Sequence, residues 1–127
     1  MTRYLADTHA LWWAAYDPDK LGRRAANALA ESPEVFMSVV SIWEIAIKVS
    51  LGKLEIRSSV SAFISELRAR DIQVLPIEPG HAVSVVDLPL HHRDPFDRLL
   101  IAQAKREKMT LLTCDPAFDE YDVKILW

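Results

Sequence analysis

Short apolar runs alternate along the chain with longer segments in which apolar residues recur at helical spacing. The runs predict five short buried strands, at residues 3–6, 35–39, 72–77, 110–113 and 123–126. The longer segments predict helices at residues 9–16, 20–31, 42–51, from Ser58 or Ser59 to residue 70, at 79–87, and from residue 95 onward. This alternation indicates an α/β fold with a central, mostly parallel sheet between two layers of helices. No repeat or linker interrupts residues 1–127, which predicts a single three-layer α/β/α domain.

The helix predicted at residues 42–51 is apolar around almost its whole circumference. Ser41 is its predicted N-cap residue, and Gly52 is its predicted end. Ser41, Glu44 and Lys48 form one narrow polar stripe. A helix of this composition is expected to be surrounded by protein, so Glu44, in its first turn, faces either a thin strip of surface or a polar cavity.

The segment at residues 91–104, HHRDPFDRLLIAQA, places two carboxylates at the start of a buried helix. Asp94 is the predicted N-cap residue, and Pro95 suits the first helical position because no partner is needed there for a backbone N–H. Asp97 then falls at about the third helical position, near the positive end of the helix dipole. The apolar positions that follow predict a helix sunk in the core, with Gln103 facing outward.

Acidic residues recur where strands end or helices begin. Asp7 directly follows the first predicted strand, Asp115 follows the fourth, and Glu44 and Asp97 lie in first helical turns. This architecture gathers such positions along one edge of the sheet, where open parallel sheets bind their ligands. Each acid also has a structural explanation, because Asp7 and Asp115 could be simple N-caps and Glu44 could pair with Lys48 one turn on.

Four carboxylates gathered with no lysine or arginine among them would repel one another. At an effective dielectric constant near 20, two carboxylates about 5 Å apart repel by roughly 3 kcal/mol. A hard divalent cation relieves this repulsion, and Mg²⁺ or Mn²⁺ prefers carboxylate and water oxygens. One such ion, or two, can activate water for attack on a phosphodiester. The pattern therefore indicates metal-dependent phosphate chemistry.

Five motifs, in this order, also resemble those of the PIN-domain ribonucleases, and more narrowly those of the VapC-like toxins of type II toxin–antitoxin systems. The motifs are LADTHALWW at 5–13, SIWEIAIK at 41–48, GKL at 52–54, DPFDRLLIAQA at 94–104 and LLTCDPAF at 111–118. The resemblance implies a PIN-like domain and a Mg²⁺- or Mn²⁺-dependent endoribonuclease. It also implies a homodimer, silenced by a cognate antitoxin protein, that leaves a 5′-phosphate and a 3′-hydroxyl on the cut RNA.

Carried over residue by residue, the resemblance assigns both catalysis and metal binding to one acidic set: Asp7, Glu44, Asp97 and Asp115. Three other residues are candidates for supporting roles. Asp94 is expected mainly to cap the helix, and its second candidate role is to contact a residue that binds the metal. Thr113 could orient a carboxylate or a bound water, and His9 could contact phosphate, although a histidine at a helix start is more often structural.

Composition limits the partners and the location. The net charge is −3, which by itself gives no support for a nucleic-acid partner. The single Cys114 fits a reducing compartment, and neither a signal peptide nor a membrane span is expected, so the protein is predicted to be cytoplasmic. His91 and His92 are expected to be bystanders in a loop. Five basic residues could hold an RNA backbone, although each alone is typical of a solvated surface: Lys48, Lys53, Arg57, Arg93 and Arg98.

The sequence leaves one alternative function and one partner surface open. A non-catalytic, receiver-like signalling or interaction module would also have an acidic pocket in a fold of this size. Such a module requires paired acids near the first strand, whereas here Asp7 is the single acid there and position 9 is histidine. The helices that carry Trp12, Trp13 and Trp43 are more apolar than the core of a monomer requires, which predicts a surface for a second copy or an amphipathic antitoxin segment.

Overall fold

A five-stranded, wholly parallel sheet forms the centre of the computed structural model, which describes residues 2–127. The strands are β1 (Tyr4–Ala6), β2 (Val35–Ser38), β3 (Ile72–Leu75), β4 (Thr110–Leu112) and β5 (Ile125–Leu126). They lie in the order β3-β2-β1-β4-β5, and every neighbouring pair is parallel. β1 therefore lies at the middle of the sheet, between β2 and β4.

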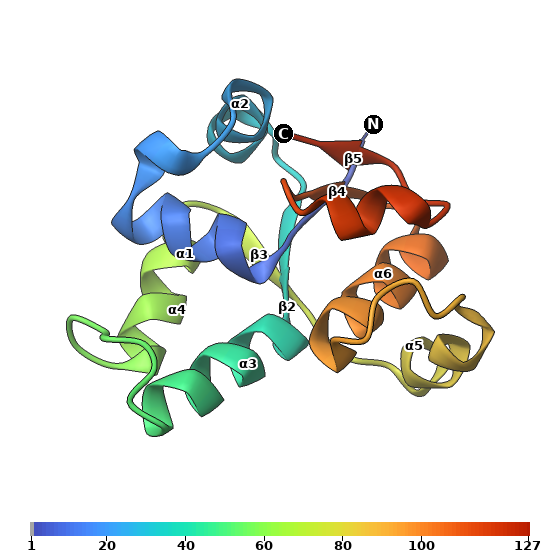
Figure 1. Ribbon diagram of the computed structural model, residues 1–127. Helices are drawn as coiled ribbons and strands as arrows, with labels where there is room; N and C mark the ends of the chain where they lie inside the picture. The colour runs from blue at the N-terminus through green and yellow to red at the C-terminus, as the bar shows by residue number, and fades with distance from the viewer. Residues whose placement is uncertain (1) are drawn as a thin grey trace.

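Helices cover both faces of this sheet (Figure 1). The helices are α1 (Thr8–Tyr16), α2 (Arg23–Glu31), α3 (Val39–Ser50), α4 (Val60–Arg68), α5 (Pro79–Ser84) and α6 (Pro95–Glu107), with 3₁₀ turns η1 (Pro18–Lys20), η2 (Val85–Asp87) and η3 (Pro116–Glu120). The helix predicted at residues 20–31 divides into η1 and α2, because Leu21 and Gly22 are extended. Within residues 2–127 no helix combines the length and the apolar character that crossing a bilayer requires.

Alternate residues of the central strands enter two separate cores. Leu5 and Leu111 point to the face covered by α6 and η3, where they pack in a cluster with residues of both elements. Their neighbours Ala6 and Leu112 point to the opposite face and pack with residues of α1, α2 and α4. Successive side chains of a strand point to opposite faces of a sheet, so two apolar faces require two layers of helices. The predicted three-layer α/β/α fold is thus confirmed.

α3 begins three residues earlier than the sequence predicted. Ser38 rather than Ser41 is its N-cap residue, because the Ser38 hydroxyl accepts a hydrogen bond from the N–H of Val40 at 3.0 Å. Glu44 is therefore the sixth residue of the helix and not part of its first turn. Gly52 follows the helix with a φ of +72°, which a glycine adopts without strain, so the predicted end of the helix is correct.

Only one face of α3 is buried, which corrects the prediction that protein surrounds it. Val40 and Ile45 enter the core, whereas the side chains of Trp43 and Leu51 are 56% and 61% exposed. Trp43 rests edge-on against Phe96 of α6 at a ring distance of 5.1 Å. The apolar composition of α3 thus exceeds what the chain's own core uses.

Gln103 of α6 is completely buried, although the helical pattern predicted an outward position. Its side-chain carbonyl accepts a hydrogen bond from the Ser38 hydroxyl at 2.5 Å. Its amide nitrogen lies 3.3 Å from both the carbonyl oxygen of Pro76 and Nδ1 of His81. The outward prediction is wrong because α5 and the segment after β3 cover the face of α6 that the sequence left polar.

The network around Gln103 continues through a second buried residue, His81. Nδ1 of His81 accepts a hydrogen bond from the backbone N–H of Glu78 at 3.0 Å, and Nε2 lies 3.0 Å from a carboxylate oxygen of Glu107. Because Nδ1 accepts, the ring proton belongs on Nε2, which donates to that carboxylate. These polar groups join the end of β2, α5 and α6 through partners that satisfy one another.

Candidate functional site

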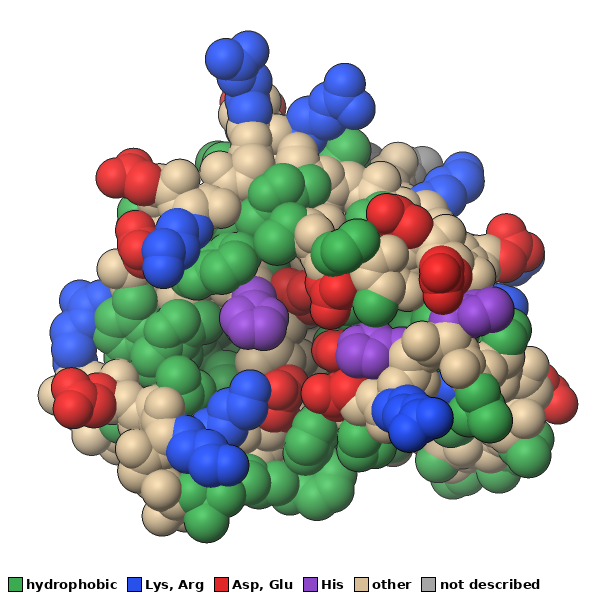
Figure 2. Space-filling view, in the orientation of Figure 1, with side chains coloured by type: hydrophobic (Ala, Val, Ile, Leu, Met, Phe, Trp, Pro, Cys, Tyr) green, Lys and Arg blue, Asp and Glu red, His purple; other side chains and the backbone are tan. Residues whose placement is uncertain are grey.

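The four predicted acids come together at the carboxyl edge of the sheet, from segments far apart in the sequence. Asp7 directly follows β1, and Asp115 comes three residues after the neighbouring strand β4. α6 leads back into β4, so its N-terminus, with Asp97, lies at the same edge. The charge of Asp115 influences Asp7, and the charge of Glu44 influences Asp97. Figure 2 shows acidic side chains gathered in a hollow, with histidines beside them.

Asp7 is both the N-cap of α1 and a buried member of this acidic cluster. Its side chain is held by a hydrogen bond from the N–H of Ala10 to Oδ1, at 2.8 Å, and by one from the Thr113 side chain. Burial is the main reason why the pKa of Asp7 is raised, and both hydrogen bonds act against that rise. Capping occupies one carboxylate oxygen, so the cap explanation and a ligand role do not exclude each other.

Both carboxylate oxygens of the buried Glu44 already have partners. The Thr8 hydroxyl donates to Oε1 at 2.7 Å, and the ammonium group of Lys48 lies 2.8 Å from Oε2. The pair with Lys48 that the sequence left open thus exists, so one ammonium group offsets part of the negative charge of the four acids. The sequence predicts no role for Thr8, whose hydroxyl is also hydrogen-bonded to that of the buried Ser41 at 3.0 Å. A threonine directly after the first-strand aspartate was the only available signal.

Asp97 lies at the third position of α6, as predicted, and Asp94 caps the helix. Oδ1 of Asp94 accepts hydrogen bonds from the N–H groups of Phe96 and Asp97, at 2.8 and 3.2 Å. The pKa of Asp97 is raised to about 6, first by burial and then by the nearby charge of Asp94, while His92 acts in the opposite direction. The carboxyl group is thus short of positive charge.

His92, which the sequence suggested was a bystander, lies within the acidic cluster. Its Nε2 is 2.8 Å from Oδ2 of Asp97 and 3.8 Å from Oδ2 of Asp115. The other oxygen of Asp115 accepts a hydrogen bond from the N–H of Ala117 at 2.9 Å and caps η3. Loop residues carry no periodic signal, so only the tertiary structure reveals that this imidazole reaches the acids.

Arg98 fastens the loop that carries His92. Its guanidinium donates to the carbonyl oxygens of Pro89 at 2.8 Å, Val85 at 3.2 Å and His92 at 3.4 Å. Tyr121 adds a hydroxyl that donates to Pro89 at 2.9 Å and accepts from the backbone N–H of His92 at 2.8 Å. Arg98 is therefore a structural residue, which corrects its inclusion among the basic residues offered to RNA.

The remaining predicted residues lie at or beyond the rim. His9 is exposed and lies 5.4 Å, ring to ring, from Trp13, and its charge acts on Asp7. Arg57 stacks on the ring of Tyr16 at 4.0 Å, which directs it away from the acids. Two further basic residues that were predicted to contact RNA, Lys53 and Arg93, are exposed.

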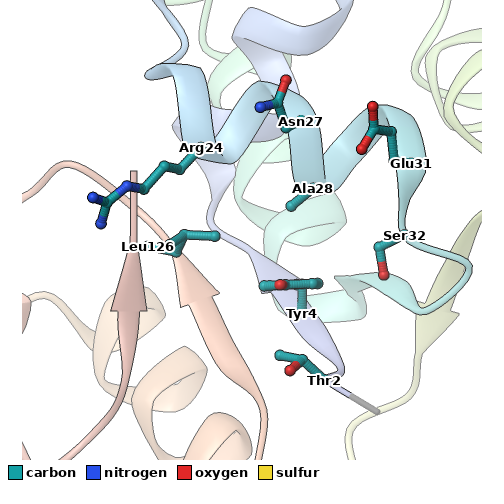
Figure 3. A pocket seen from close by; sticks show the side chains of 8 residues that line it. All are labelled: Thr2, Tyr4, Arg24, Asn27, Ala28, Glu31, Ser32 and Leu126. Carbon is teal, nitrogen blue, oxygen red and sulfur yellow. The ribbon is translucent and has the colours of Figure 1, made fainter.

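A separate cavity of about 480 Å³ lies between α2, the beginning of β1 and β5 (Figure 3). Its lining mixes apolar side chains such as Tyr4 and Leu126 with polar groups of α2 such as Arg24, Asn27 and Glu31. None of the predicted acids is part of this lining, and no set of residues in it resembles a reactive centre.

The acidic cluster fits a hard divalent cation. Asp7 and Asp115 each use one oxygen as a helix cap, and Asp7 is also bonded by Thr113. A carboxylate has about four lone-pair sites, so each can still accept a further partner. The half-buried Asp97 has the imidazole of His92 as its side-chain hydrogen-bond partner, while the nearby charges of Asp94 and Glu44 repel its carboxylate. Burial and neighbouring negative charge raise the pKa of Asp7 and of Asp97, a repulsion that a cation would relieve. Carboxylate oxygens are the donor set that Mg²⁺ and Mn²⁺ prefer.

The fold resembles several solved structures along nearly its full length. VapBC from Salmonella typhimurium bound to DNA aligns with a TM-score of 0.74 and 14% identity, covering 99% of this chain and 98% of that one. VapBC2 from Rickettsia felis, bound to a DNA fragment from its promoter, aligns at 0.73 and 14% identity, with 98% of both chains covered. FitAcB from Neisseria gonorrhoeae aligns at 0.69 and 19% identity, covering 98% and 96%. At these identities the likeness concerns the fold.

Sequence comparison identifies the family. The chain is 28% identical over 116 residues to Ribonuclease VapC22 of Mycobacterium tuberculosis (strain ATCC 25618 / H37Rv), with 91% of this chain and 88% of that protein covered. The family model of the PIN domain matches residues 4–124, which include all four acids. The suspected resemblance is confirmed: this chain belongs to the PIN domain family.

Proposed function

We propose that this protein is a metal-dependent endoribonuclease that hydrolyses RNA phosphodiester bonds, and that it is the toxin of a toxin–antitoxin pair. The observation that carries the proposal is the convergence of Asp7, Glu44, Asp97 and Asp115 at one edge of the sheet. The similarity of this chain to a protein named a ribonuclease supports the same class of reaction. The receiver-like alternative loses support, because membership of the PIN domain family does not favour it.

The acids would hold Mg²⁺ or Mn²⁺ directly or through waters, with Asp97 and Asp115 open to solvent and Asp7 and Glu44 deeper. When bound, such an ion supplies a water of lowered pKa and stabilises charge on the phosphate during attack.

The chain's own residues hold this constellation rigid. Thr113 and the N–H of Ala10 orient Asp7, while Thr8 and Lys48 fix the two oxygens of Glu44. The α6 dipole favours negative charge at Asp97. Such preorganised acids do not need to reorient during the reaction, which is how a site of this kind lowers the barrier.

Purified protein is expected to cut single-stranded RNA in Mg²⁺ or Mn²⁺ and to stop when EDTA exceeds the metal. The products should carry a 5′-phosphate and a 3′-hydroxyl, because water is the nucleophile and no 2′-hydroxyl attack is needed. End-labelled RNA resolved on a sequencing gel, with phosphatase treatment of the fragments, measures both. Cleavage that persists in excess EDTA, or 2′,3′-cyclic phosphate ends, would rule out this mechanism.

We further propose a cognate antitoxin and a second copy of the chain as partners, in the cytoplasm, where the RNA substrate is found. Solved complexes named VapBC share the fold, which supports an antitoxin partner. Five large apolar side chains are exposed among the described residues: Trp43, Leu51, Val83, Val86 and Leu90. Trp43 and Leu51 both belong to α3 and its C-cap, and large apolar side chains left exposed on one element support a protein interface there.

Light scattering after size exclusion is expected to give twice the mass of one chain. Trp43→Ser should shift the distribution toward one copy, because it removes a large exposed aromatic side chain from α3. Glu66→Gln, on the exposed side of α4, serves as the control and should leave the mass unchanged. A strict monomer that also captures no antitoxin segment would contradict the partner proposal.

A further inference from the structure

His92 presents a nitrogen atom where the cluster's half-buried carboxylates meet. Nε2 of His92, an oxygen of Asp97 and an oxygen of Asp115 all lie within 4.8 Å of one another. The nitrogen is 2.8 Å from the first oxygen and 3.8 Å from the second. Two ligand atoms that each lie about 2.1 Å from one ion are about 3.0 Å apart at a right angle and about 4.2 Å apart when opposite. The shorter separation is close to the right-angle value and the longer one lies between the two limits, so small shifts of these side chains would let the atoms share one ion.

The imidazole is held in this position by partners that do not belong to the acidic cluster. The backbone N–H of His92 donates to the Tyr121 hydroxyl, and its backbone carbonyl accepts from Arg98. The imidazole ring packs edge-on against Phe118, with the ring centres 6.1 Å apart. A ring fixed by packing and by a hydrogen-bonded loop loses little freedom when it binds a ligand.

The second ring nitrogen of His92, Nδ1, makes only a weak contact, which does not fix the nitrogen that carries the ring proton. Nδ1 of His92 lies 3.5 Å from the backbone nitrogen of Asp94, which is longer than an ordinary hydrogen bond. In this structure Nε2 donates to Oδ2 of Asp97, but Nδ1 has no strong partner that would keep the ring proton from moving there. With its proton on Nδ1, the ring can offer the lone pair of Nε2 to an ion, whereas the protons of a lysine or an arginine at this position would exclude a cation.

We infer that His92 is a nitrogen ligand in the metal centre, beside Asp97 and Asp115, and that it gives the centre a preference for Mn²⁺ over Mg²⁺. The inference rests on the proposed metal-dependent function and adds to it a ligand outside the four acids. Both Mg²⁺ and Mn²⁺ take carboxylate and water oxygens, but Mn²⁺, a first-row transition ion, accepts an imidazole nitrogen more readily than the harder Mg²⁺. One aromatic nitrogen among carboxylates thus changes which ion the same fold selects.

Pulsed electron paramagnetic resonance of Mn²⁺ bound to the purified full-length chain tests this directly. The wild-type protein is expected to show coupling of the Mn²⁺ electron spin to an imidazole ¹⁴N nucleus, and His92→Gln is expected to lose it. In titrations with each metal alone, His92→Gln should lower the ratio of the Mg²⁺ to the Mn²⁺ dissociation constant by about tenfold. His91→Gln is the matched control, because His91 is exposed and pairs with Glu120 outside the cluster, and it should behave as wild type.

The outcomes separate this inference from the proposed function. Mn²⁺ that binds and is weakened by Asp97→Asn, but shows no ¹⁴N coupling in the wild type, overturns the His92 ligand and leaves the metal-dependent function standing. ¹⁴N coupling that persists in His92→Gln overturns it equally. Absence of any Mn²⁺ binding overturns both. The wild-type spectrum decides the matter even if a variant folds poorly.

Discussion

Asp97→Asn is expected to lower the rate of RNA cleavage by at least about 100-fold, which corresponds to about 3 kcal/mol of transition-state stabilisation. The amide is nearly the same size and can still accept the hydrogen bond at the position that Nε2 of His92 faces. It removes only the negative charge that a hard cation requires. Single-turnover cleavage of labelled RNA in saturating Mn²⁺ measures the loss.

Asp122→Asn is the matched control, since Asp122 is exposed and lies before β5, at the opposite edge of the sheet. It should cleave at the wild-type rate. Cleavage by Asp97→Asn within a factor of three of the wild type would remove Asp97 from the proposed centre.

Asp97→Asn should also stabilise the metal-free protein. Folding raises the pKa of Asp97 from 3.8 to about 6, so the folded state binds a proton more tightly than the unfolded state. Stability from this group is fully present below about pH 4 and is lost as the pH rises through about 6. At neutral pH the carboxylate therefore opposes folding, and Asn should add about 1–2 kcal/mol in EDTA. Metal at ten times its dissociation constant should stabilise the wild type by about 1.4 kcal/mol through mass action, and Asp97→Asn by less.

Gln103→Ala is expected to lower the free energy of unfolding by about 2–4 kcal/mol. The substitution removes the partner of the buried Ser38 hydroxyl and one partner of the buried His81, and it leaves a cavity in α6. A buried polar group without a partner loses its hydration with nothing in exchange. Urea denaturation followed by circular dichroism measures the change.

Gln73→Ala provides the control, because Gln73 of β3 is exposed and its amide nitrogen lies 3.5 Å from the carbonyl oxygen of Pro33. It should change stability by no more than about 0.5 kcal/mol. Gln103→Met, which keeps the volume, separates the cavity from the lost hydrogen bonds and should recover only part of the stability. A loss below about 1 kcal/mol for Gln103→Ala would mean that the network holds these elements together only weakly.

The sequence by itself determined the layers, the order of elements and the positions of the acids along the chain. Short apolar runs between amphipathic segments predict parallel strands with crossover helices, because both faces of such a sheet must be covered. Asp94 and Pro95 predict the start of α6 correctly, since a cap and a first-turn proline act through the backbone within four residues. Asp7 and Asp115 follow their strands, so the strand boundaries alone brought them to one edge.

Only the tertiary structure decided which polar groups meet. The helical pattern of α6 predicts Gln103 at the surface, yet α5 covers that face of the helix. The Gln103 side chain bonds to Ser38 at the end of β2 and lies 3.3 Å from His81 of α5. His92 lies in a loop whose shape depends on Arg98 and on a tyrosine 29 residues further along the chain. Local patterns report the period of one helix or strand, whereas burial and hydrogen-bond partners depend on the elements packed against it. The chain order thus fixes the edge where the acids gather, and packing fixes which nitrogen and hydroxyl groups join them.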